Sequence, residues 1–167
     1  MQLKVSTDYA VRLLLSFGGE SVWLTAEELS GKMAIPRPTV VKIMSRMKGK
    51  GWVKAREGLH GGYALNAPLS SISLLDIFQV MEETVRINRC LEEDEYCSRF
   101  AVGDCPVRAA YVQIQGMLER LFGLLTLDKV ANRDFASLDV ARAIGGMQGQ
   151  ADRGCGGGRS PETPTCW

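Results

Sequence analysis

Apolar residues recur at helical spacing through the first fifty positions, and polar breaks divide them into three expected helices. The first helix runs from about Thr7 to Phe17 and ends at Gly18, a residue type that often follows a helix. The second begins at Thr25, because Thr25 and Glu28 have the spacing of a capping box. The third begins at two prolines, which a helix entrance tolerates because the missing N–H has no partner there. Its apolar face carries Val40, Ile43, Met44 and Met47, and its polar face carries Arg37, Thr39, Lys42, Ser45, Arg46 and Lys48.

Two short runs of strand-forming residues follow the third helix. Residues 52–56 form the first run and residues 63–65 the second, and a glycine-rich turn at 57–62 joins them. Two short helices, a basic helix and a β-hairpin stand in the order of a winged helix-turn-helix. The pattern therefore predicts a winged helix-turn-helix domain over residues 1–70.

Beyond residue 70 the pattern predicts one short and one long helix. Ser73 and Asp76 have the spacing of a second capping box, which begins a helix that continues to about Glu83. Residues 86–105 are irregular and acidic. In residues 106–125 the apolar side chains return every three or four positions, as in the seam of a coiled coil. The seam contains Val107, Ala110, Tyr111, Ile114, Met117, Leu118, Leu121 and Leu125.

The chain therefore divides into three regions. The winged-helix domain is followed by residues 71–135, which hold the short helix, the cysteine loop and the long helix. Residues 136–167 form a C-terminal extension that we expect to be largely disordered, with one further helix at 136–144. From residue 145 onward this extension is rich in glycine and has little to bury. The expected fold class is mainly α with a small β-hairpin.

Charge is distributed unevenly, although the net charge of the 167 residues is only +1. Residues 1–72 hold ten basic and five acidic side chains, a net of +5, and residues 73–105 hold three basic and eight acidic ones, a net of −5. A basic head joined to an acidic segment suggests that the head binds a polyanion.

The basic helix and the turn of the hairpin supply the candidate contacts to DNA. An α-helix fits the major groove, where arginine can donate two hydrogen bonds to guanine. Glycines in a turn allow the close backbone approach that a wing entering the minor groove needs. The candidates are Arg37, Pro38, Thr39, Lys42, Arg46, Arg56, His60, Gly61 and Gly62.

Three of the five cysteines, Cys90, Cys97 and Cys105, fall within sixteen residues. Thiolates are the ligands of iron–sulfur clusters, and zinc accepts three thiolates with one further ligand. From the residues alone, a metal centre, a thiol redox switch and inert cysteines all remain open. The apolar run at 13–17 is too short for a signal peptide, and no stretch could span a bilayer, so we expect a cytoplasmic chain without a membrane partner. No catalytic motif is present, and we expect no enzyme activity.

The motifs together resemble the Rrf-two family of bacterial transcription regulators, over about residues 1–135. The resemblance implies a homodimer that binds palindromic double-stranded DNA, with the long helix as the dimerisation helix. In cluster-binding members an iron–sulfur centre lies between the head of one subunit and the cysteine loop of the other. The resemblance rests on VSTDYAVR at 5–12, IPR at 35–37, GGYAL at 61–65, ISLLDI at 72–77 and the three cysteines that follow.

The same resemblance implies an iron–sulfur cluster, [4Fe-4S] or [2Fe-2S], on the three cysteines. Some members supply the fourth ligand from a histidine just after the third cysteine, but the one histidine of this chain, His60, lies in the expected wing. Other members use an aspartate at the position of Asp8, donated by the partner subunit. Asp8 also suits a helix cap or a partner of the helix dipole, and Arg12 stands one turn away to pair with it. The cysteine spacing is wider than in cluster-binding relatives, and the resemblance does not extend to Cys155 and Cys166.

Two other classes of protein account for part of the pattern. Electron transfer through an iron–sulfur cluster would explain the cysteines but not the basic helix and wing. A winged-helix protein-interaction module would explain the fold but not the clustered cysteines. We therefore expect a DNA-binding regulator that senses redox state, nitric oxide or iron status through the cysteine loop, with zinc or bare thiols as the alternative to a cluster.

Overall fold

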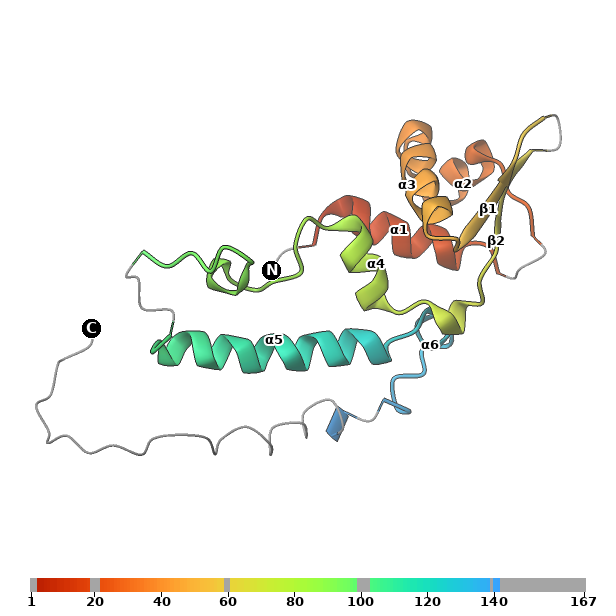
Figure 1. Ribbon diagram of the computed structural model, residues 1–167. Coiled ribbons are helices and arrows are strands. Elements are labelled where there is room, and N and C mark those ends of the chain that lie inside the picture. The colour runs from red at the N-terminus through yellow and green to blue at the C-terminus, as the bar shows by residue number, and fades with distance from the viewer. Residues whose placement is uncertain (1–2, 19–21, 59–60, 99–102, 139, 142–167) are drawn as a thin grey trace, which may run out of the picture.

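The computed structural model describes residues 3–18, 22–58, 61–98, 103–138 and 140–141. Its first half is a head of three helices with a β-hairpin that projects from it (Figure 1). The order of elements is the one expected for a winged helix-turn-helix. The elements of the head are α1 (Val5–Leu15), α2 (Ala26–Met33), α3 (Arg37–Gly49), β1 (Val53–Arg56) and β2 (Gly62–Leu65).

Local sequence signals explain where these helices begin. The Thr25 hydroxyl accepts the backbone N–H of Glu28 at 3.1 Å, and the Glu28 carboxylate accepts the Thr25 N–H at 2.7 Å, which confirms the capping box. The expected prolines stand at the start of α3. Helix α1 begins at Val5 and ends at Leu15, two residues earlier at each end than its pattern predicted.

The apolar faces of these helices meet in one core. Leu13 and Leu14 of α1 are fully buried against the predicted apolar face of α3, all of whose members are at most 2% exposed. Burial of such side chains contributes about 1.5–3 kcal/mol each, which is why the position of α3 is set by its apolar face. The polar face of α3 is left toward solvent.

The hairpin is extended by a third, very short strand. β1 and β2 pair antiparallel, with Arg56 opposite Gly62. On the other side of β2, Leu24 and Tyr63 exchange backbone hydrogen bonds of 2.9 and 2.8 Å. The segment before α2 is thereby fixed to β2.

In the second half of the chain, a long helix lies below the head in the view of Figure 1. Its helices are α4 (Leu74–Met81), α5 (Pro106–Leu124) and α6 (Leu127–Asn132), with 3₁₀ turns η1 (Leu69–Ser71) and η2 (Arg89–Leu91). The second capping box is present, with the Ser73 hydroxyl accepting the N–H of Asp76 at 3.2 Å. Helix α4 ends at Met81, before the expected Glu83. Of the expected helix at 136–144, residues 136–138 are not helical, residues 140 and 141 are helical, and residues 139 and 142–144 lie outside the described residues.

Helix α5 is attached to the head at one end and along α4. The Leu74 N–H donates to the Leu125 carbonyl at 2.9 Å, and the Leu127 N–H donates to the Ile72 carbonyl at 2.9 Å. Phe78 of α4 and Phe122 of α5 meet edge to face, with ring centroids 5.0 Å apart. The predicted seam of α5 is not buried within the chain, since Val107 is 54% and Ile114 44% exposed. Within the described residues, no helix has the length and apolar character needed to cross a membrane.

Candidate DNA-binding head and cysteine loop

The polar face of α3 forms the first part of the candidate DNA-binding surface. The side chains of Arg37, Lys42 and Arg46 are exposed, and Thr39 is half-buried. Arg37 lies 3.5 Å from the Glu27 carboxylate, in a pair whose side chains are 64% and 80% exposed. Such an exposed pair holds the arginine only weakly, so the guanidinium can exchange this partner for a phosphate or a base.

Val41 belongs to the same surface and was missed by the sequence analysis. It is 40% exposed, on the helix between Pro38 and Ser45. An exposed apolar side chain at this position could contact the methyl group of thymine in a major groove. The signal in the sequence was Val41 itself, which follows the buried Val40 and therefore falls outside the apolar face.

The two wing glycines have a reason within the fold. A Cβ on Gly62 would lie 2.6 Å from the Leu24 carbonyl oxygen, and φ there is +146°. A Cβ on Gly61 would lie 2.8 Å from the carbonyl oxygens of Arg56 and Gly58. These contacts make both glycines necessary for the hairpin, whatever else they do. Their presence alone is therefore weaker support for DNA contact than the sequence suggested, and His60 lies outside the described residues.

The three clustered cysteines line one pocket at the start of α5. The pocket measures about 390 Å³ and is also lined by Tyr96 and Tyr111. All three cysteines are half-buried. Among the residues that the structure describes, no three His, Cys, Asp or Glu side chains lie close enough to hold a metal ion. The fold thus brings the predicted ligands to one place without converging them on a point.

Arg108, in the first turn of α5, holds this pocket together and was also missed. Its Nε donates to the Cys90 carbonyl at 3.1 Å, its guanidinium pairs with Glu95, and its backbone N–H donates to the Cys105 sulfur at 3.4 Å. Its side chain is 25% exposed. One arginine therefore connects both ends of the cysteine loop to α5, a role that depends on residues thirteen and eighteen positions away and has no local signal.

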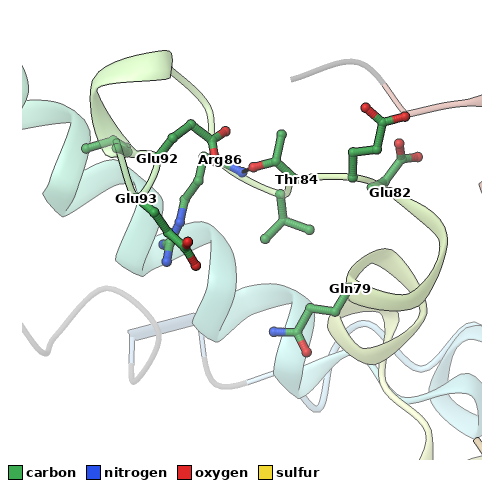
Figure 2. A pocket seen from close by; sticks show the side chains of 9 residues that line it. Gln79, Glu82, Thr84, Arg86, Glu92 and Glu93 are labelled. Carbon is green, nitrogen blue, oxygen red and sulfur yellow. Dashed lines mark hydrogen bonds between the residues drawn. The ribbon is translucent and has the colours of Figure 1, made fainter. Parts of the chain in front are cut away.

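The segment that leads from α4 into the cysteine loop is fixed to α5. Gln115, which is 4% exposed, accepts the Ile87 N–H at 2.9 Å and donates to the Val85 carbonyl at 3.1 Å. Arg86 donates to Glu119 at 2.8 Å. We call residues 82–88 the connecting arm. Figure 2 shows the side chains around a pocket of about 370 Å³ beside this arm, with carboxylates of Glu92 and Glu93 near Arg86.

The connecting arm also reaches the first turn of α1. The Glu82 carboxylate accepts the Lys4 backbone N–H at 2.8 Å and the hydroxyl of the fully buried Thr7. The adjacent Glu83 pairs with the Lys4 ammonium at 2.8 Å, and this hydrogen bond holds the pKa of Glu83 below its usual value. The helix start that has no cap of its own is thus capped from a distant segment.

Asp8 lies within α1 rather than at its cap. The N-cap is Lys4, so the interpretation of Asp8 as a capping residue was wrong. Asp8 stands in the first turn, where a negative charge suits the helix dipole, and its carboxylate pairs with Arg12 at 2.7 Å. Both side chains are at least half exposed, so the carboxylate is accessible from outside the chain.

Comparison with known proteins agrees with this arrangement. The family Rrf2, described as an iron-dependent transcriptional regulator, matches residues 3–133. A relative from Aquifex aeolicus, named as an HTH-type transcriptional regulator, is 26% identical over 106 residues, or 64% of this chain and 74% of the relative. The solved structure of CymR (YrzC), the global cysteine regulator of B. subtilis, superposes with a TM-score of 0.62 at 18% identity and covers 80% of this chain and 98% of that one. T. potens IscR gives a TM-score of 0.59 at 15% identity over 83% of this chain and 92% of its own.

A three-helix head with an exposed basic third helix and a hairpin wing is the architecture of a winged helix-turn-helix, and the family match makes the chain a transcription regulator of this class. Within that class, the chain belongs to the Rrf2 family. The family expected from the sequence motifs and the mainly helical fold with a two-stranded hairpin are therefore confirmed.

Proposed function

We propose that this protein is a homodimeric transcription regulator that binds a palindromic operator through α3 and the wing. In this proposal its DNA affinity is set by a centre on Cys90, Cys97 and Cys105. The observation that carries it is the combination of an exposed basic α3 with three cysteines that line one pocket. It acts in the cytoplasm and catalyses no reaction.

On the DNA side, α3 presents its first turns to the major groove. Arg37, Lys42 and Arg46 are exposed on one helix whose opposite face is locked in the core. Pro38 and Thr39 lie in the same first turns, and Arg56 with the glycine turn supplies the wing. A helix that reads DNA needs this division between a rigid apolar face and an exposed cationic face.

On the sensing side, three thiols are by their chemistry the ligands that an iron–sulfur cluster takes, although a cluster would require the loop to bring them closer together. Cys90, Cys97 and Cys105 would hold it, with Asp8 from a second copy of the chain as the further ligand. The exposed position of Asp8 on α1 supports donation across a dimer. When bound, a cluster would supply a redox-sensitive and nitric-oxide-sensitive group at the end of the connecting arm. The chain itself holds the cysteine loop on α5 through Arg108.

A thiol or zinc sensor is the second candidate for the same pocket. The three thiols are half-buried and do not converge on a metal position among the described residues, an observation that favours thiol chemistry over either metal centre. Oxidation of two thiols to a disulfide by one molecule of hydrogen peroxide, which is reduced to two molecules of water, would then reorder the loop without any metal. Both candidates use the same pocket and the same path to the head.

That path runs through the connecting arm. The cysteine loop is joined to α5 by Arg108, the arm is joined to α5 by Gln115 and Arg86, and its other end caps α1 through Glu82. A change in the order of the loop would shift the arm and with it the start of α1. Since palindromic half-sites are about one helical turn apart, a small change in the separation of the two heads alters affinity.

The first experiment is anaerobic purification followed by a visible absorption spectrum with iron, sulfide and zinc analysis. Brown protein with equal iron and sulfide supports the cluster. Colourless protein that contains zinc, or no metal, and that cannot be reconstituted with iron and sulfide excludes the cluster and leaves the second candidate.

The DNA-binding surface is tested separately. A duplex selected by the protein from a random library serves as the probe. Arg37→Ala and Lys42→Ala should each weaken binding, by about 1–3 kcal/mol where a base contact is lost. Arg133→Ala, which removes an equal charge beyond the head, is the control. Equal affinity of all three variants and the parent protein would remove α3 from the reading role.

A further inference from the structure

The outer face of the wing carries two cations that lie outside the α3 surface. Lys54 and Arg56 are exposed on β1, while Val53 between the sheet and the core is buried. Because side chains alternate along a strand, Lys54 and Arg56 point to the same face of the hairpin. That face is turned away from the core of the head.

An aromatic ring reaches this face from the third short strand. The Leu24–Tyr63 pairing, extended by one residue, places Trp23 beside Ala64, and Ala64 is paired with Lys54. The intervening strand β2 offers only Ala64 and Gly62 on this face. The small central residues leave room for the indole to extend across β2 toward β1.

The indole contacts both cations. The Arg56 guanidinium carbon lies 4.3 Å from the centroid of the Trp23 ring, and the Lys54 ammonium lies 5.7 Å from it. Both distances are within the range of cation–π attraction. A guanidinium held by its face against a ring still has its N–H donors in the plane of the group, where they suit a phosphate.

Such a contact does more than stabilise the hairpin. A free arginine or lysine loses rotamer entropy when it docks on a ligand, and a side chain already held against a ring has lost part of it beforehand. Two cations beside one ring also form a doubly charged patch, and Glu57 is the acidic residue next to it in the chain. The patch lies on strand β1 of the hairpin that projects from the head, and α3 packs against β1 (Figure 1).

We propose that Trp23 is a positioning residue that holds Lys54 and Arg56 in place to contact the phosphate backbone of duplex DNA. This rests on the proposed function in so far as the head binds DNA. It assigns a role to a segment outside α3 and the turn of the wing. Lys54 and Arg56 touch the phosphates in this arrangement, and Trp23 acts through them.

The test is a double-mutant cycle on binding of a fluorescein-labelled mixed-sequence duplex, measured at several salt concentrations with the full chain. Trp23→Ala should weaken binding about two- to fivefold, and Trp23→Phe, which keeps an aromatic face, should restore most of it. Arg56→Ala should lower the slope of log affinity against log salt by about 0.9. In the Arg56→Ala, Lys54→Ala background, Trp23→Ala should have no further effect, because the positions are coupled.

A purely structural role would give a different result. If Trp23 only supports the hairpin, its replacement weakens binding by the same factor in both backgrounds, which overturns the proposal. Unchanged affinity in Trp23→Ala also overturns it, and circular dichroism and thermal melts show whether each variant folds. If Lys42→Ala weakens binding while the wing variants do not, the proposed function stands and this inference fails. If the parent protein binds no duplex at any salt concentration, both fail.

Discussion

At the scale of single residues, Asp8 is the proposed further ligand of a cluster on the cysteine loop. Its carboxylate is exposed and paired with Arg12 at 2.7 Å. An exposed ion pair of this kind contributes about 0–1 kcal/mol to stability, so the fold does not depend on it. An exposed carboxylate in the first turn of α1 could serve as a ligand to a metal centre held by the cysteines of a neighbouring subunit.

We therefore expect Asp8→Asn to change the visible spectrum, or to speed the loss of iron, in protein reconstituted anaerobically with iron and sulfide. The amide is a poor ligand but keeps the size of the side chain. Thermal unfolding should be nearly unchanged. Arg12→Gln is the matched control, because it breaks the same ion pair and leaves the carboxylate in place. Identical spectra and iron-release rates for Asp8→Asn and the parent would remove Asp8 from the ligand set.

Arg108 makes a second prediction at this scale. It joins the Cys90 carbonyl, Glu95 and Cys105 to the first turn of α5. Hydrogen bonds from a charged donor contribute about 1.5–3 kcal/mol, and 1.4 kcal/mol corresponds to a tenfold change in an equilibrium. Arg108→Ala should therefore raise the rate at which Cys90 is alkylated by about tenfold or more in metal-free protein. Cys105 should change less, because its sulfur accepts the backbone N–H of residue 108, which alanine keeps.

Arg120→Ala, which removes an arginine further along α5, is the control for that measurement. Mass spectrometry of the alkylated peptides reports each cysteine separately. Arg108→Lys should give an intermediate rate, because it keeps the charge but not the two-armed geometry. Alkylation rates that do not differ between Arg108→Ala and Arg120→Ala would show that the loop is ordered by something else.

At the scale of the elements, α1 depends on a cap that comes from the connecting arm. Glu82 accepts the Lys4 N–H and the Thr7 hydroxyl, and Thr7 is fully buried. Glu82→Ala leaves these donors without that acceptor, and we expect a loss of about 1–2 kcal/mol in the free energy of unfolding. Chemical denaturation followed by circular dichroism measures it.

Glu83→Ala provides the comparison within the same arm. Glu83 has a side chain that is 91% exposed and pairs with Lys4 at the surface, so its loss should cost little. If the arm carries the signal, Glu82→Ala should also reduce the difference in DNA affinity between the two states of the cysteine loop. An equal stability loss in both variants would contradict the capping role.

The helices were predictable because their signals are local. Thr25 with Glu28 and Ser73 with Asp76 mark two helix starts within four residues, and the apolar spacing of α3 identifies its buried face. The cap of α1 was not predictable, because its acceptor is 78 residues away in the chain. The same holds for the Leu24 strand and for Arg108, whose partners are defined only once the chain has folded.

For the candidate site, the sequence predicted which residues gather but not how. The cysteines were expected together, and they do line one pocket, yet their spacing could not show that they fail to converge among the described residues. The wing glycines were expected at a DNA contact, whereas close approach of the Leu24 backbone already requires Gly62. The residue types thus predicted the chemistry of the cysteine pocket, but they did not show that the fold itself requires a glycine at position 62.

At the scale of the whole molecule, α5 presents an apolar seam that the described part of the chain leaves partly exposed. Val107 is 54% and Ile114 44% exposed, although the apolar side chains of this seam repeat every three or four residues. Such a seam buries itself against another helix of the same kind. The proposed homodimer would cover it with α5 of a second copy.

Two substitutions on α5 separate this proposal from a general effect of charge. Ile114 lies in the seam and Val112 does not, yet each is 44% exposed. Ile114→Asp should convert a dimer to a monomer in size-exclusion chromatography with light scattering, because a buried unpaired carboxylate in an interface is costly. Val112→Asp should remain dimeric.

DNA binding gives a second measurement on the monomeric variant. It should bind a palindromic duplex far more weakly than the parent, because the link between the two heads is lost. It should bind a single half-site equally well, because each head is intact. If both variants stay dimeric, the two chains meet elsewhere, and the coupling from cysteine loop to head must follow a different interface.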